Sequence, residues 1–185
     1  MLMRYVRLAA VAVMTLVGTF GTVGKASADS AHDIDAGVDH TLARFYSKVG
    51  GSRDLIAKAR GVLVFPSVVK AGLGLGGEYG EGALIVDGQW GGYYNTVSAS
   101  IGFQLGVAQR SVIIAFMTDE ALTNFRRTHG WKVGVDGSVA IITLGVGASV
   151  DTNKLTNPVV GFIFDPKGLM YNLTLEGSKI TQISR

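Results

Sequence analysis

A run of strict alternation at residues 97–108 constrains the fold more than any other feature of the sequence. Every second residue is apolar, and the residues between them are small or uncharged polar. Successive side chains of a β-strand point to opposite faces, so this period of two predicts a strand. We expect the apolar face to lie in the core and the small-residue face to lie against another backbone or a narrow barrel interior. The apolar set is Val97, Ala99, Ile101, Phe103, Leu105 and Val107.

Most of the chain after residue 60 is also predicted to form strands. Asp87-Gly88 follows an apolar run and is a typical two-residue hairpin turn. Pro66 lacks a backbone N–H, so we expect it at a strand end or a sheet edge. Residues 119–129 are expected to form one short helix, which Gly130 is placed to end.

Residues 29–60 are predicted to be helical. Apolar residues between Ile34 and Val49 recur at steps of three or four, which places them on one helix face. Gly50-Gly51 ends this helix, and Ser52 is placed to cap a second one. The whole pattern predicts an α+β fold in one domain, residues 29–185: a glycine-rich, mostly antiparallel β-sheet curled into a barrel or sandwich, with N-terminal helices and one short inserted helix.

The first 28 residues have the pattern of a cleavable signal peptide. Arg4 and Arg7 precede an apolar stretch at 8–17, and residues 26–28 read Ala-Ser-Ala, a cleavage pattern. The alternative is a membrane-anchoring helix, which needs about 20 strongly apolar residues. The glycines and the lysine within 18–25 shorten the apolar run. We therefore expect cleavage after residue 28 and a periplasmic or secreted protein.

The charge of the mature chain excludes a general attraction to nucleic acid. The full chain has 17 basic and 14 acidic residues, and three of the basic ones (Arg4, Arg7 and Lys25) lie in the leader, which holds no acidic residue. The remaining balance of 14 to 14 is neutral and creates no long-range positive field. There is no cysteine, so no disulfide can form.

No motif of an enzyme or a metal site is present. Residues 72–77 are glycine-rich like a phosphate-binding loop, but Glu78 follows, where a carboxylate would repel phosphate. Glu78 and Glu81 share one short loop, whereas paired catalytic carboxylates face one another across a substrate. Structural or ion-pairing roles are therefore favoured for both. The three histidines lack metal-ligand spacing, and we predict no catalytic residue, no metal and no cofactor.

One local cluster is suited to an anionic surface. Residues 126–132 bring together Arg126, Arg127, Trp131 and Lys132. Each basic residue near an anionic lipid surface contributes about 1 kcal/mol of attraction, and tryptophan prefers the membrane interface. The alternative is an ordinary helix end with the indole in the core.

Several motifs resemble the SYLF domain family. The most specific are Val68-Val69-Lys70-Ala71-Gly72 and Gly76-Gly77-Glu78-Tyr79-Gly80-Glu81-Gly82, and the likeness extends from about residue 42 to residue 180. Eukaryotic members bind phosphoinositides, and in yeast endocytic-patch proteins the domain also binds actin. The resemblance implies lipid binding, with the helix around 34–49 as the membrane-contacting segment. An exported bacterial protein does not meet actin, so the lipid part of the implication is the one we carry over.

We therefore predict an exported domain that binds a lipid or membrane surface without catalytic activity. A periplasmic protein-interaction or assembly module, with envelope proteins as partners, is the alternative. A hydrolase is the third hypothesis, and it requires a raised pKa at Glu78 or Glu81. The predicted lipid-binding residues are Arg44, Lys48, Lys70, Arg126, Arg127, Trp131 and Lys132.

Overall fold

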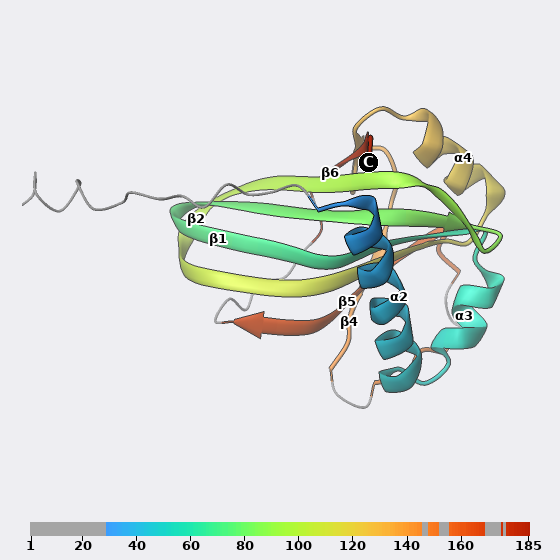
Figure 1. Ribbon diagram of the computed structural model, residues 1–185. Helices are drawn as coiled ribbons and strands as arrows, with labels where there is room; N and C mark the ends of the chain where they lie inside the picture. The colour runs from blue at the N-terminus through green and yellow to red at the C-terminus, as the bar shows by residue number, and fades with distance from the viewer. Residues whose placement is uncertain (1–28, 146–147, 152–155, 169–174, 176) are drawn as a thin grey trace, which may run out of the picture.

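The computed structural model describes residues 29–145, 148–151, 156–168, 175 and 177–185. The expected leader lies outside the described residues, so its cleavage stays a prediction. The described part begins with two helices and continues as a sheet that curls around its own interior (Figure 1). No helix within these ranges is both long enough and apolar enough to cross a membrane.

The first helix, α2 (Ala31–Lys48), forms where the apolar spacing predicts it. Ser30 caps its start: the hydroxyl accepts a hydrogen bond from the Asp33 N–H at 3.2 Å, and the Asp33 carboxylate accepts one from the Ser30 N–H at 3.4 Å. Satisfying these free backbone donors defines where the helix begins. Its buried stripe, which includes Ile34, Val38 and Phe45, packs against the sheet.

The second helix, α3 (Ser52–Lys58), differs from the prediction at its first residue. Gly51 is the N-cap, with φ of 77°, and Ser52 is the first helical residue. The Ser52 hydroxyl is buried and donates to the Val49 carbonyl at 2.6 Å instead of capping the helix. A side chain at position 51 would place Cβ 2.3 Å from the Val150 carbonyl oxygen, so this turn requires glycine.

One long hairpin makes up most of the sheet. Strand β1 (Gly61–Val86) pairs antiparallel with β2 (Gln89–Phe116) along nearly its full length. Asp87 and Gly88 connect them with φ of 51° and 73°, the positive values that a two-residue hairpin turn requires, which confirms the predicted turn. Pro66 does not end a strand: β1 continues through it, and the pairing shifts register between Phe65 and Val68.

The hairpin bends back on itself, so that the two halves of β1 lie side by side (Figure 1). A Cβ at Gly82 would lie 2.0 Å from the Val64 carbonyl oxygen, and one at Gly80 would lie 2.7 Å from that of Ser67. Only glycine permits this approach of two backbones. In β1 the bend falls in the glycine-rich stretch 72–77, and in β2 it falls in the residues that pair with this stretch. The pairing of the two strands shifts register again here, between Leu73 and Leu75.

Within the described ranges, shorter strands extend the hairpin into one six-stranded sheet. The order is β3-β6-β2-β5-β4, with β1 paired to β2, and the result is a half-barrel. The β4–β5 pair is parallel and the others are antiparallel, so the predicted α+β class and curled sheet are confirmed. A third helix, α4, is capped by Thr118 and matches the predicted inserted helix. The bounds are α4 Asp119–Arg127, β3 Trp131–Lys132, β4 Ala140–Thr143, β5 Val159–Gly168 and β6 Lys179–Ile183.

Apolar side chains pack on both sides of the sheet. On the side that we call the inner face, Phe116, Phe125 and Trp131 belong to one cluster inside the curl. On the other side, the outer face, α2 covers a second cluster that includes Ile113 and Phe162. A sheet that is buried on both faces explains why apolar residues follow one another without a polar partner in 112–116.

The predicted core face of residues 97–108 is wrong at every position whose burial the structure describes. Val97, Ala99 and Val107 are exposed. Val107 lies six residues from Ile113 on one strand and therefore points to the same outer face. Helix α2 crosses the sheet away from the bend (Figure 1), and Asp29, which precedes it, lies at the border of this region. The inner face carries Ala108 and Arg110, which are buried.

Candidate functional site

The outer face beyond α2 carries a group of exposed apolar side chains. The fractional exposure is 41% for Val69, 47% for Tyr79, 45% for Val97 and 61% for Val107. Ala71 and Ala99 are exposed beside them. Contiguous exposed apolar surface of this kind marks interaction sites in soluble proteins. We call these six residues the bare outer face: Val69, Ala71, Tyr79, Val97, Ala99 and Val107.

The strands that carry the bare outer face hold no charged residue in 71–77 or 98–109. Their bordering charges point to the inner face and pair with one another. Glu78 accepts from the Arg110 guanidinium at 2.6 Å and lies 3.3 Å from the Lys70 ammonium, and all three side chains are buried. This triad joins both halves of β1 to β2 at the base of the bend. Lys70, predicted to bind lipid, is therefore inside the protein.

Two shallow depressions run across the bare outer face. One of about 520 Å³ lies between Val69, Tyr79 and Val97. A second of about 520 Å³ is lined by Ala71, Gly72, Gly106 and Val107. Both are open to solvent and mostly apolar. The first also has Asp29, Glu78 and Glu81 in its lining, whereas the second is lined by apolar residues and glycine.

Lysines flank this surface on the neighbouring strands. Lys167 of β5 is paired with Gln109, and Lys179 of β6 is paired with Val97. Paired residues project to the same side of a sheet, and both lysines are exposed. Lys132 of β3 pairs in turn with Lys179, so one of the predicted cations does lie in this row.

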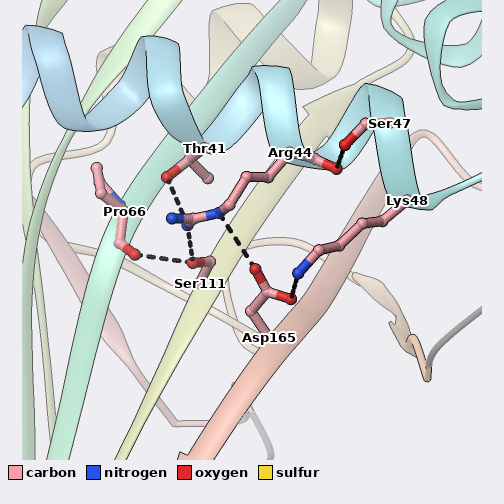
Figure 2. A network of polar contacts seen from close by, with 7 residues as sticks. All are labelled: Thr41, Arg44, Ser47, Lys48, Pro66, Ser111 and Asp165. Atoms are coloured by element: carbon pink, nitrogen blue, oxygen red, sulfur yellow. Dashed lines mark hydrogen bonds and ion pairs between the residues drawn. The ribbon is translucent and has the colours of Figure 1, made fainter.

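A polar network joins the end of α2 to β5 (Figure 2). The Asp165 carboxylate lies 3.1 Å from Arg44 and accepts from the Lys48 ammonium at 2.6 Å. Arg44 also donates to the Ser111 hydroxyl at 3.2 Å. Asp165 has φ of 52°, a left-handed conformation that aspartate tolerates better than most residues. The two predicted cations are thus brought together, with one carboxylate between them.

A mostly apolar cavity of about 400 Å³ opens beside this network. Its lining includes Val49, Leu144 and Phe164, with Lys48 and Asp165 at the polar part of the wall. Gly168 lies three residues after Asp165 in β5 and pairs with Ala108, which directly follows Val107 of the bare outer face in β2. The cavity and the bare outer face are therefore linked by one short stretch of β5.

The predicted cluster at 126–132 does not form one surface. Trp131 is buried, and its ring stands edge-on to Phe116 and Phe125 at centroid distances of 6.3 and 5.5 Å. Arg126 and Arg127 are exposed on α4, which lies at the opposite end of the sheet from the bend (Figure 1). The structure thus separates these two arginines from Arg44 and Lys48.

The second predicted carboxylate, Glu81, is also engaged. It is bound by the Arg185 guanidinium and by the Tyr79 hydroxyl, and its side chain is 3% exposed. Burial opposes its ionisation, but the hydrogen bonds from Tyr79 and Arg185, the Arg185 charge and the Asp29 N–H outweigh burial, so the pKa of Glu81 lies below its ordinary value. This direction is opposite to the one that a general acid needs. Within the described ranges, no three His, Asp or Glu side chains are grouped to hold a metal ion.

The bare outer face was missed because the alternation at 97–108 was assigned to the core. The signal that could have found it is the absence of charge from both bend segments, 71–77 and 98–109. A solvated loop or edge normally carries charged residues, whereas a segment that meets an apolar partner does not.

Comparison with known proteins identifies one family. Residues 97–184 match the family model Ysc84, described as "Las17-binding protein actin regulator". This is the SYLF domain family, so the resemblance to that family is confirmed for residues 97–184, whereas the motifs at 68–82 lie outside the matched region. The matched region covers most of β2 and the elements that follow it. A search of curated proteins found no match to the chain.

Proposed function

We propose, from the match of residues 97–184 to the SYLF domain family, that this chain binds lipid at a membrane surface through the bare outer face. The single observation that carries this proposal is the exposure of Val69, Tyr79, Val97 and Val107 on one side of the bent hairpin. The family is consistent with lipid or actin-related binding. The local chemistry favours the lipid.

The apolar side chains supply the main attraction. Fully burying a valine side chain is worth about 1.5–3 kcal/mol. Val97 and Val107 are about half exposed, so each retains roughly half of that free energy for contact with acyl chains. Tyr79 stands at the edge with its hydroxyl bound to Glu81, and a tyrosine with one polar end suits the headgroup boundary.

The flanking cations favour an anionic headgroup. Lys167 and Lys179 are exposed on the strands to either side of the bare outer face. Each contributes about 1 kcal/mol near an anionic leaflet. Arg44 and Lys48 share Asp165, so this network adds one net positive charge at the mouth of the 400 Å³ cavity. That cavity is apolar enough for one acyl chain.

We propose that this site binds without catalysing a reaction. We also propose that the mature domain lies outside the cytoplasm after loss of residues 1–28. Support for a binding role comes from the carboxylates: Glu78 is held by Lys70 and Arg110, and Glu81 by Arg185 and Tyr79. Neither carboxylate is left to attack a substrate or to transfer a proton.

Vesicle co-sedimentation tests the proposed function. The purified protein is mixed with phosphatidylcholine vesicles and with vesicles that also contain phosphatidylglycerol. The variant Val97→Ser/Val107→Ser should bind at least tenfold more weakly, because about 1 kcal/mol of apolar contact is lost at each position. The matched control is Val135→Ser, a valine that is 74% exposed on the loop after β3. Equal binding by the control and the double variant, or no binding by the unmodified chain, contradicts the proposal.

A second candidate function is protein interaction or assembly. The bare outer face is equally suited to a protein partner or to a second copy of this chain, since exposed apolar patches serve both purposes. Light scattering separates the two. Self-association that is abolished by Val97→Ser/Val107→Ser, without any vesicle binding, favours assembly over lipid binding.

A further inference from the structure

The buried Glu81 carboxylate lies where the mature chain is expected to begin. Its side chain is 3% exposed and accepts hydrogen bonds from Arg185 and from the Tyr79 hydroxyl. It also accepts the backbone N–H of Asp29. Asp29 is the first residue after the expected cleavage site, and it lines the same depression as Glu81 and Tyr79.

We propose that Glu81 is the binding site for the N-terminal ammonium group of the processed chain. A signal peptidase would hydrolyse the Ala28–Asp29 peptide bond with one water molecule, leaving a carboxylate on Ala28 and an amine on Asp29 that takes up a proton at neutral pH. The nitrogen that now donates to Glu81 as a neutral amide N–H would then carry a positive charge. Processing would turn a hydrogen bond into an ion pair inside the fold. This inference does not depend on lipid binding.

The surroundings explain why a carboxylate is needed at this point. Asp29 directly precedes Ser30, the N-cap of α2, and the positive end of a helix dipole repels a nearby cation. Glu81 supplies the compensating charge from β1. The Arg185 charge already faces Glu81, so the ammonium and the guanidinium share one carboxylate, which normally accepts several hydrogen bonds.

The other titratable groups around the site leave this role to Glu81. Glu78 lines the same depression but is held by Lys70 and Arg110. Tyr79 is neutral, because burial first and then its hydrogen bond to Glu81 raise the pKa of its hydroxyl. The Asp29 carboxylate is exposed. Among these groups, Glu81 is the buried acceptor that touches the Asp29 nitrogen.

The pH dependence has a defined sign. An α-amino group titrates near about 7.7–8.0 when exposed. Contact with the Glu81 carboxylate favours the ammonium form and raises its pKa in the folded state. The added stability is therefore fully present below the unfolded-state pKa and is lost as the pH rises through the folded-state pKa.

The experiment compares two forms of the chain. One is secreted with its own leader from a bacterial host, and mass spectrometry establishes whether it begins at Asp29. The other is made without the leader and keeps Gly-Ser ahead of Asp29, which moves the ammonium away from Glu81. Nitrogen-15 NMR follows the titration of the α-amino group, and urea unfolding is measured at pH 6.5 and pH 10.

In the processed form we expect the α-amino pKa to be higher by about one unit than in the extended form, which corresponds to about a tenfold larger folding constant at pH 6.5. The difference in folding constant should vanish at pH 10. Glu81→Gln should abolish the pKa difference, and Glu120→Gln on the exposed side of α4 should leave it unchanged. If Glu81→Gln does not fold, the comparison of the two N-termini alone decides the question.

Equal α-amino pKa values in the two forms overturn the proposal. So does a secreted chain that begins at any residue other than Asp29. Vesicle binding of the processed form is measured separately. If this form binds no vesicles but its α-amino pKa is higher than that of the extended form, the proposed function is contradicted and this inference stands.

Discussion

The outer face of the sheet has two parts that differ in what covers them. Under α2, Ile113 and Phe162 are fully buried beneath Phe45 and its neighbours. Beyond α2, Val97 and Val107 belong to the same strand and the same face, yet they are exposed. Gln109 and Ser111 occupy the outer-face positions between these two apolar parts of the strand.

This difference shows that alternation identifies an apolar face but not the element that covers it. In the covered part, the free energy of burial is already used within the fold. In the bare part it remains available, and a lipid surface can take the place that α2 takes elsewhere. We therefore expect truncation of an apolar side chain to lower the stability of the fold in the covered part, and to lower lipid binding but not stability in the bare part.

The largest expected effect is at the covered part. Phe45 is buried, and its ring lies 5.4 Å from those of Phe162 and Phe164. Phe45→Ala should lower the free energy of unfolding by about 4 kcal/mol, because it leaves a cavity between α2 and the sheet. Val107→Ala should change it by less than about 0.5 kcal/mol. Urea unfolding measures both, and similar costs at the two positions would contradict the comparison.

The next effect concerns how the bare part is held in place. Glu78→Gln would leave the Lys70 and Arg110 charges buried on the inner face without their carboxylate. Removal of one partner from a buried ion pair costs about 3–5 kcal/mol. We expect about 3 kcal/mol in urea unfolding, with loss of hydrogen-exchange protection first in 69–80 and 97–110. Protection that is lost first under α2 would show that the triad does not secure the bend.

The smallest expected effect is on vesicle binding, and it distinguishes the lysines beside the bare outer face from the arginines that the sequence predicted as lipid-binding. Lys167→Gln/Lys179→Gln should weaken binding to phosphatidylglycerol vesicles by about fivefold for each lysine, since each contributes about 1 kcal/mol. Stability should stay within about 0.5 kcal/mol. Arg126→Gln/Arg127→Gln on α4 is the control that removes the same charge at the other end of the sheet. A stronger effect of the arginine pair would assign the headgroup contact to α4 instead.

Much of the fold could be predicted from residue patterns. The stripe from Ile34 to Val49 predicts α2, and Asp87-Gly88 predicts the hairpin turn, because both depend on local geometry. The bend could not be predicted in this way. It depends on the approach of Gly80 and Gly82 to a distant part of the same strand, and one sequence does not report which backbones meet.

The candidate site was predicted only in part. Arg44 and Lys48 do lie together, but their shared partner Asp165 is 117 residues away from Lys48 in the chain. Trp131 and Lys70 were also predicted to contact lipid, but both side chains are buried. Burial of a charged residue depends on a partner such as Glu78, and this pairing is set by the bend.

Labelling at single cysteines tests the central claim most directly, because the natural chain has none. Val107→Cys and Val135→Cys each receive a polarity-sensitive fluorophore, and anionic vesicles are then added. We predict a blue shift and quenching by brominated acyl chains at position 107, and neither change at position 135. An unchanged spectrum at 107 in the presence of bound vesicles would contradict membrane contact by the bare outer face.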